Sequence, residues 1–236
     1  MGFVVLPALI ADISAVYDVY FEAFKGHPIT RALFPSATEE DLTNPESEFR
    51  CGHLQLRLCF RIPVANRITV RLILPMYCST GKIVGMALWD VYLTPSTWKK
   101  GEIGWLQGKE RERAEAMIGL LWDAREKMWS NERYLYCHLV AVRPDSQRRG
   151  IGELLVEYGK KIATQAHLPI YTESSRAAIK LYENSGFSWL KERLIHKPEN
   201  LLPGMADSRP EDREVPLCVW LPGGDERLLP KGVELA

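Results

Sequence analysis

The chain has 236 residues, 46% of them hydrophobic and 10% aromatic, enough to bury one substantial core or two small ones. Thirty basic residues balance thirty acidic ones, so no net charge draws the protein to nucleic acid or to an anionic membrane. No apolar run reaches the ~20 residues of a membrane helix, and the five scattered cysteines suit reduced thiols, so we expect a soluble protein of the cytoplasm or nucleus.

The first part of the chain is expected to form one strand followed by helices. In order, the patterns predict a strand over 3–9, a helix over 13–25, a short helical piece between His27 and Pro35, and a helix over 46–61. Asp12 is expected to cap the helix over 13–25 by accepting an amide proton from its first turn.

The rest of the chain alternates strands and helices. In order, the patterns predict strands over 67–77 and 83–92, a helix over 108–130, a strand over 134–142, a helix over 151–167, a strand over 168–172, a helix over 175–184, and strands over 187–195 and 215–221. Gly186 is expected to end the helix before it in a left-handed conformation. The irregular stretch 197–214 contains three prolines, and such a long loop in a compact domain is usually functional or disordered.

A glycine-containing turn stands between the strand over 134–142 and the next helix. Its sequence is Gln147-Arg148-Arg149-Gly150-Ile151-Gly152. Glycines let the backbone approach a ligand closely, and a helix start offers unpaired N–H groups at the positive end of a dipole. These features suit a pyrophosphate. The alternative is a plain corner whose glycines only make the turn, and neither a Walker A loop nor a dinucleotide fingerprint is present.

Three stretches taken together resemble one known family. They are residues 139–144, 147–152 and 181–187, and they resemble the GNAT superfamily of acyl-CoA N-acyltransferases, with the close resemblance covering 135–187. Residues 20–35 also resemble fungal members of the superfamily. The resemblance implies an α/β fold with a central mixed, mostly antiparallel sheet, splayed between its fourth and fifth strands, and helices on both faces. It implies a single domain over 1–236, with the strand and acceptor-side helices in 1–66, the acyl-CoA-binding core in 134–187 and an acceptor-side loop in 197–214.

The resemblance also assigns acetyl-CoA as the acyl donor and names the residues that would hold it. Its pantetheine arm would pair with the backbone of Val140, Ala141 and Val142. Its pyrophosphate would lie on Arg148, Arg149, Gly150, Ile151, Gly152 and Glu153. Ser174, Ser175 and Ala178 would border the pantetheine or adenosine, although many members of the family have asparagine near Ser174. No cysteine or histidine falls at metal-ligand spacing, so no metal is expected.

Acyl transfer to an amine needs a neutral amine, a donor to the carbonyl oxygen and a proton for the leaving thiolate. A free strand N–H near Leu139–Ala141 could be that donor. The resemblance makes Tyr182 the acid that protonates the sulfur, whereas its spacing alone suits a core aromatic. No general base stands out, because five candidates are each conceivable and each more typical of structural groups: Glu22, Asp90, Glu102, His138 and Glu173.

The acceptor is expected to be a primary amine of a small molecule, attacking directly in a ternary complex. Its pocket would be built by the hairpin, the loop 197–214 and the first helix with its bend, which carries Phe21, Phe24, His27 and Pro28. Two other functions stay open: an N-acetyltransferase of proteins or peptides, which would favour an acidic open groove, and a non-catalytic acyl-CoA-binding module. A homodimer is also left open.

Overall fold

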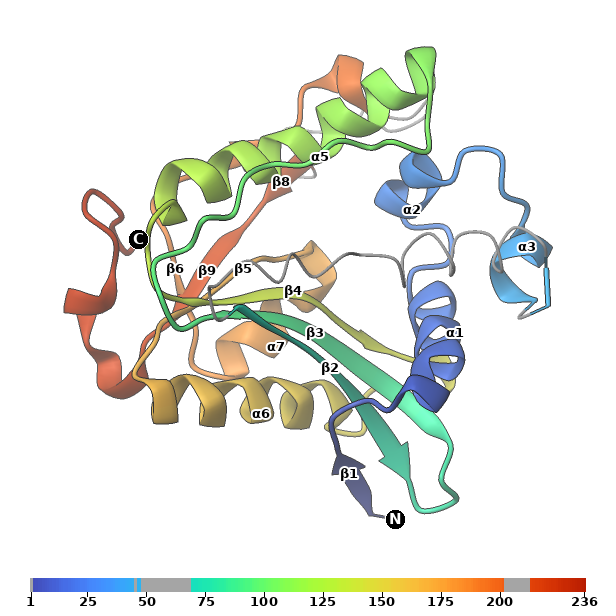
Figure 1. Ribbon diagram of the computed structural model, residues 1–236, viewed down its shortest axis with the longest axis horizontal. Helices are drawn as coiled ribbons and strands as arrows, with labels where there is room; N and C mark the ends of the chain where they lie inside the picture. Colours follow the sequence, from blue (N-terminus) through green and yellow to red (C-terminus); the bar gives the residue numbers. More distant parts are fainter. Residues whose placement is uncertain (1, 45, 48–68, 202–212) are drawn as a thin grey trace.

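The computed structural model describes residues 2–44, 46, 47, 69–201 and 213–236. Most of the predicted helix over 46–61 and the middle of the stretch 197–214 therefore lie outside the described residues. The described part is built on a seven-stranded sheet in the order β1-β2-β3-β4-β5-β9-β6 (Figure 1). Only β4 and β5 run parallel, and every other neighbouring pair is antiparallel. The predicted fold class is thus confirmed.

The N-terminal half supplies the first three strands of the sheet and the helices of one face. Its elements are β1 (Phe3–Val5), η1 (Ile10–Asp12), α1 (Ile13–Ala23), α2 (Pro28–Leu33), α3 (Glu39–Thr43), β2 (Thr69–Cys78), β3 (Ile83–Tyr92) and α5 (Gly108–Trp129). The prediction that Asp12 caps α1 is wrong, because its carboxylate accepts the Leu9 N–H at 2.7 Å and closes the preceding turn instead. The first strand also ends earlier than predicted, two residues before Pro7, whose missing N–H suits the end of a ladder.

The C-terminal half contains the parallel pair and closes the sheet. Its elements are β4 (Leu135–Val142), η2 (Pro144–Ser146), α6 (Ile151–Ala166), β5 (Ile170–Glu173), η3 (Arg176–Ala178), α7 (Ile179–Asn184), β6 (Ser188–Trp189), β7 (Leu194–Ile195), η4 (Pro198–Asn200), β8 (Glu214–Val215), β9 (Leu217–Trp220), η6 (Pro222–Gly224) and η7 (Glu226–Leu228). Gly186 has the predicted left-handed conformation, with φ +78°.

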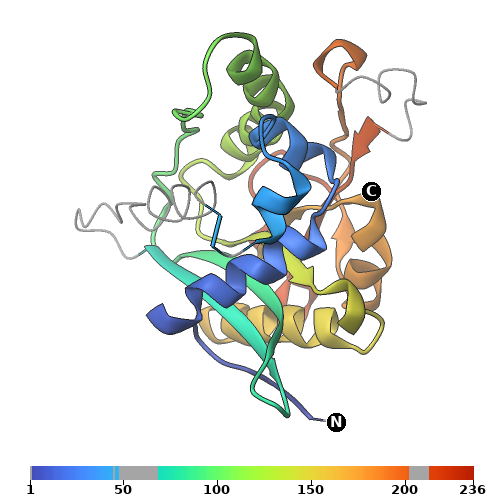
Figure 2. The ribbon, with the colours of Figure 1, turned by 90° about the vertical axis from the view of Figure 1, so that its right-hand side faces the viewer.

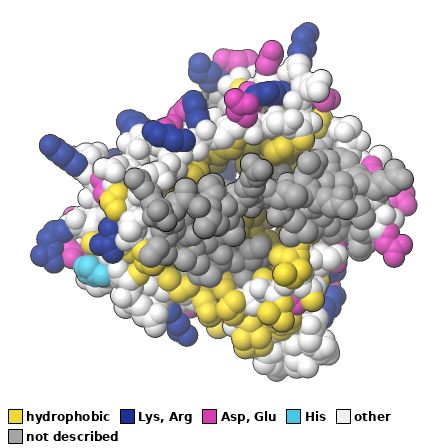
Figure 3. All heavy atoms as spheres, viewed as in Figure 1, with side chains coloured by type: hydrophobic (Ala, Val, Ile, Leu, Met, Phe, Trp, Pro, Cys, Tyr) yellow, Lys and Arg dark blue, Asp and Glu magenta, His cyan; other side chains and the backbone are white. Residues whose placement is uncertain are grey.

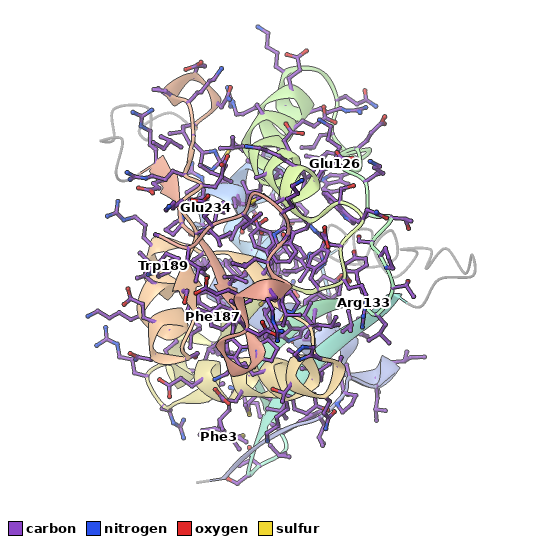
Figure 4. The ribbon with its side chains drawn as sticks, turned by 90° about the vertical axis from the view of Figure 1, so that its left-hand side faces the viewer. Phe3, Glu126, Arg133, Phe187, Trp189 and Glu234 are labelled. Carbon is purple, nitrogen blue, oxygen red and sulfur yellow. The ribbon has the colours of Figure 1, made fainter. Side chains whose placement is uncertain are left out.

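Three predictions for this half are corrected. The helix over 175–184 begins as the separate 3-10 turn η3. The single strands over 187–195 and 215–221 are both wrong, because β6 and β9 belong to the main sheet whereas β7 and β8 pair in a second, two-stranded sheet. The C-terminal segment runs beside β6, where the Ala236 N–H donates to the Trp189 carbonyl at 2.9 Å, and Figure 4 labels Trp189 and Glu234 near each other.

Helices cover both faces of the sheet. α6 lies along one face, and α1 and α5 lie against the other (Figures 1 and 2). α6 approaches β3 closely because Gly159 has no side chain: a Cβ there would lie 2.5 Å from the indole of Trp89. This close contact fixes the helix that begins at the glycine turn. Within the described residues, no helix is both long and apolar enough to span a membrane.

Candidate active site

The parallel strands β4 and β5 separate soon after they meet. Their register contains only Leu135 opposite Ile170 and Tyr136 opposite Tyr171, although β4 continues to Val142. Along β4, Leu135 to Cys137 are buried, whereas His138, Leu139 and Val140 are only partly so. The splay predicted between the fourth and fifth strands is therefore present, and it opens at Cys137.

Two residues of β4 direct backbone groups into the splay. The Arg143 N–H donates to the Val84 carbonyl of β3 at 2.9 Å. Because successive residues of a strand point their polar groups to opposite edges, Val142 and Val140 turn theirs toward β5. The side chain of Gln147 confirms this direction, since its Nε2 donates to the Val142 carbonyl at 3.1 Å. Ala141 lies between them, and its carbonyl is near Gly85 of β3.

The glycine turn has the geometry of an anion site. Gly150 stands at the N-cap of α6 with φ +76° and no side-chain cap, and Arg148 is also left-handed, with φ 58°. The first intrahelical bond runs from the Leu154 N–H to the Gly150 carbonyl, so the amides of the first turn point out of the helix. A Cβ on Gly150 would meet nothing within 4 Å. Open space, exposed arginines and outward amides fit a pyrophosphate.

The serines of the next turn are placed differently from one another. Ser174 is buried, and its hydroxyl donates to the Ser175 carbonyl at 2.8 Å, so it is already engaged with the backbone. Ser175 is exposed at the start of η3, and Ala178 ends that turn partly buried. Of the three residues predicted near the pantetheine or adenosine, Ser175 therefore has the most accessible polar group.

Tyr182 lies at the closed end of the splay, on the α6 side of the sheet. Its hydroxyl is 3.9 Å from Cys137 Sγ, and its ring packs edge-on against Phe187. Burial raises the Tyr182 pKa well above its ordinary value, so the hydroxyl keeps its proton. Thr172, which no sequence pattern singles out, links the strands here by donating to the Cys137 carbonyl at 3.0 Å.

The opposite face of the splay carries a histidine and a buried carboxylate. His138 Nε2 lies 2.7 Å from Asp90 Oδ2, with the His138 side chain 24% exposed and that of Asp90 only 2%. The buried guanidinium of Arg125 lies 4.0 Å from the same carboxylate oxygen. Arg125 donates to the hydroxyls of Tyr92 and Tyr134, each at 2.9 Å, and its guanidinium lies 3.5 Å from the ring centre of Tyr136.

A second carboxyl joins this cluster from β5. Glu173 accepts the Tyr136 hydroxyl at 2.6 Å, and its other oxygen is buried without a hydrogen-bond partner in the described part of the chain. Burial raises the Glu173 pKa above its ordinary value, against the lowering effect of the Tyr136 hydrogen bond. Three of the five conceivable bases, Asp90, His138 and Glu173, thus lie together. Glu102 instead pairs with Arg111 at the surface.

Most of the residues of the first helix and its bend that were predicted to line the acceptor pocket instead pack against neighbouring side chains. Phe21 is buried against Phe34, and Phe24 packs edge-on with His27. His27 Nδ1 accepts the Ile29 N–H at 3.3 Å and so caps α2, and burial lowers its pKa, which favours the neutral ring that this contact needs. The hairpin contributes Asp90, through β3, to the cluster around His138.

Residues 78–188 match the family model described as the acetyltransferase (GNAT) domain. This match supports membership of the GNAT superfamily. It is 27% identical over 146 residues to the probable acyltransferase SID5 of Ajellomyces capsulatus, an alignment that covers 61% of this chain and 97% of that protein. The GNAT domain spans β3, the splay, the glycine turn and Tyr182, so an acyltransferase with acetyl-CoA as its substrate fits the described geometry.

Solved GNAT structures share the fold over nearly the whole chain. Arylalkylamine N-acetyltransferase 2 of Aedes aegypti superposes with a TM-score of 0.64 at 11% identity, covering 94% of this chain and 99% of that one. A histone acetyltransferase HPA2-related protein of Corynebacterium glutamicum gives 0.55 at 22% identity, over 92% and 96%. A phosphinothricin acetyltransferase of Sinorhizobium meliloti, solved in complex with AcCoA, gives 0.52 at 13% identity, over 99% and 96%.

Proposed function

We propose that this GNAT acyltransferase transfers an acetyl group from acetyl-CoA to a primary amine of a small molecule, by direct attack in a ternary complex. The pyrophosphate would lie on the backbone of the glycine turn, from Arg148 to Glu153. The pantetheine arm would lie along Val140 to Val142, bordered by Ser175 and Ala178. Tyr182 would donate its proton to the leaving thiolate, from the position of its hydroxyl at the closed end of the splay.

The nature of the acceptor face is the observation that supports a small molecule. Of its two carboxyls, Asp90 is buried and Glu173 is partly buried, and each already accepts from a neighbouring side chain. The described residues of this face therefore present no row of exposed carboxylates, which a basic peptide would need. Charges of both signs are mixed on α5 beside it, as the visible face in Figure 3 shows.

A CoA-release assay tests the choice of acceptor. The panel contains 2-phenylethylamine, tryptamine, agmatine, spermidine and a lysine-containing histone-tail peptide, and the arylalkylamine and histone probes follow the names of the two structural relatives. We expect at least one small amine to be acetylated with a kcat/KM more than about tenfold above that of the peptide, a difference of ~1.4 kcal/mol in transition-state stabilisation.

Each remaining outcome favours another function. Preference for the peptide would make the protein a peptide N-acetyltransferase. Binding of acetyl-CoA without turnover on any amine of the panel would favour a non-catalytic acyl-CoA-binding module. Neither result would alter the assignment of the GNAT fold.

A further inference from the structure

A buried hydroxyl stands at the closed end of the splay, where the ladder between β4 and β5 stops. Thr172 is 1% exposed, and its neighbours Cys137 and Cys218 belong to the buried cluster on the α6 side of the sheet. Burying a hydroxyl is costly unless it makes a hydrogen bond, and an aliphatic β-branched residue suits a buried strand equally well. A threonine in this apolar surrounding therefore indicates that its hydrogen bond has a role.

The register of β4 and β5 shows which backbone bond is missing at this point. The last pair is Tyr136 with Tyr171, although both strands continue beyond it. The next pair of a parallel ladder would be Cys137 with Thr172, and it would need the Glu173 N–H to donate to the Cys137 carbonyl. That carbonyl instead accepts the Thr172 hydroxyl at 3.0 Å, whereas the second contact of the hydroxyl, with the Glu173 carbonyl, is longer at 3.5 Å. The side chain thus satisfies the carbonyl without drawing the β5 backbone to it.

β4 bends away from β5 directly beyond this carbonyl. The register of β3 with β4 skips one residue of β4 between Cys137 and Leu139, so His138 is the extra residue of a β-bulge. A bulge bends the strand that carries it. Cys137 is therefore the last residue of β4 before the bend, and its carbonyl is the last one that the β5 ladder could use.

We infer that Thr172 sets where the splay begins and so positions the thioester of acetyl-CoA next to Tyr182. The Tyr182 hydroxyl is 3.9 Å from Cys137 Sγ, at the level where the ladder stops. One further pair would hold the two strands ~4.8 Å apart at that level, which leaves no room for the pantetheine arm. Thr172 acts through the strands and is a positioning residue. This inference rests on the proposed function, in which the arm lies in the splay.

Removal of the hydroxyl should let the ladder close by one pair. Thr172→Val leaves the buried Cys137 carbonyl without its donor, which is costly. The Ser174 N–H faces β9, where it donates to the Pro216 carbonyl at 2.8 Å, so the Glu173 N–H faces β4. A crystal structure of the Thr172→Val variant without ligand should therefore contain a bond from the Glu173 N–H to the Cys137 carbonyl. Thr172→Ser keeps a hydroxyl and should keep the splay as it is.

Two ligands that differ in the pantetheine arm separate this role from a general loss of stability. CoA has the arm, whereas 3′-phospho-ADP has the same adenosine and pyrophosphate and lacks it. By titration calorimetry, we expect Thr172→Val to raise the Kd for CoA about tenfold or more, because the closed strands exclude the end of the arm. The Kd for 3′-phospho-ADP should stay within about twofold, and Thr172→Ser should keep both values within about twofold.

Thr30→Val is the matched control. It removes another buried threonine hydroxyl, on α2, and should change neither Kd. If Thr172→Val does not fold, Thr172→Cys takes its place, because a thiol is only a weak donor. The same pattern is then expected, with CoA weakened and 3′-phospho-ADP unchanged.

Three results would overturn the inference: a Thr172→Val variant that binds CoA as tightly as the wild type, equal losses for the two ligands, or a splay that still begins after the pair of Tyr136 and Tyr171 in the variant. If the wild-type protein binds CoA no more tightly than 3′-phospho-ADP, the arm does not lie in the splay and the proposed function is at fault. The crystal structures then still decide whether Thr172 ends the ladder.

Discussion

Burial raises the pKa values of both Tyr182 and Glu173 above those of exposed groups. The two side chains lie on opposite faces of the sheet. The Tyr182 hydroxyl keeps its proton because burial disfavours the phenolate, which makes it a donor and not a base. The Glu173 carboxyl holds its proton to higher pH for the same reason. Each expectation can be checked with a substitution that removes one functional atom and keeps the shape of the side chain.

Tyr182→Phe should lower kcat by roughly ten- to a thousandfold, near or below the ~10²–10⁴ of a positioned acid. The acceptor KM and the melting temperature should change little, because the ring and its packing on Phe187 remain. Tyr158→Phe on α6 is the matched control and should leave kcat unchanged. If Tyr182→Phe keeps kcat within about twofold while chemistry is rate-limiting, Tyr182 is a packing residue.

Glu173→Gln should change how stability depends on pH. Since the pKa of this carboxyl is raised in the folded state, the free energy of unfolding falls as pH rises from the unfolded pKa of ~4.3 through the folded value, by at most ~1.4 kcal/mol per pH unit. The variant keeps an acceptor for Tyr136 and should lack this slope. Urea unfolding at several pH values measures it, and the exposed Glu226→Gln should leave it intact. A wild-type-minus-variant difference that is constant with pH would contradict the expectation.

At the scale of elements, the contact between α6 and β3 decides where the glycine turn stands. Two glycines of the sheet–helix contact have no room for a side chain: a Cβ on Gly159 would lie 2.5 Å from Trp89, and one on Gly85 would lie 2.8 Å from Ile151. Interiors packed this closely transmit any added volume into a shift of backbone or side chains. The start of α6 is therefore positioned by residues far from the turn itself.

Gly159→Ala should destabilise the protein by ~1–3 kcal/mol, because the methyl group must displace the Trp89 indole or lift the helix. Gly119→Ala is the matched control on α5, where a Cβ meets nothing within 4 Å, and it should stabilise by up to ~1 kcal/mol through helix propensity. The midpoints of urea unfolding measure both. Equal effects of the two substitutions would show that the close contact is easily relieved.

The sequence predicted the elements around the splay well and the rest of the molecule less well. The helix over 151–167 and the strand over 134–142 lie within a residue or two of α6 and β4, because their apolar patterns and the glycine turn are local signals. The break between β6 and β7 was missed, since hydrophobic residues continue through it and only tertiary pairing separates the two. The prediction that Asp12 caps α1 is wrong because the turn before the helix uses the same carboxylate, which accepts the Leu9 N–H.

One part of the candidate site also has a local sequence signal and the other part has none. The glycine turn is contiguous in sequence, so its position could be predicted. The cluster of Asp90, Arg125 and His138 comes from three elements and one bulge, so no spacing pattern announces it. A lone strand histidine has no sequence signal that shows whether its ring contacts a buried carboxylate. Only the pairing of β3 with β4 brings the carboxylate to it.

At the scale of the whole molecule, acetyl-CoA should stabilise the native state. A ligand at a hundred times its Kd adds ~2.7 kcal/mol to the free energy of unfolding and raises the melting temperature. Gly150→Asp should abolish that rise, because it puts a carboxylate into the open space where the pyrophosphate would lie. Gly232→Asp adds the same group at another left-handed glycine in open space, φ +85°, and should retain the rise. If Gly150→Asp retains it too, the pyrophosphate lies elsewhere.

The position of β9 has a consequence for the order in which the chain can fold as it is synthesised. β9 lies between β5 and β6 in the sheet, yet it follows both in the chain and lies beyond the residues of the GNAT match. Until Trp220 has emerged from the ribosome, β5 has an open edge and β6 has no strand to pair with. The part of the sheet formed by β5, β9 and β6 is therefore completed late. The glycine turn, Tyr182 and β6 have all been translated before β9 is available. A nascent chain that stopped short of β9 would expose an unpaired edge to other chains.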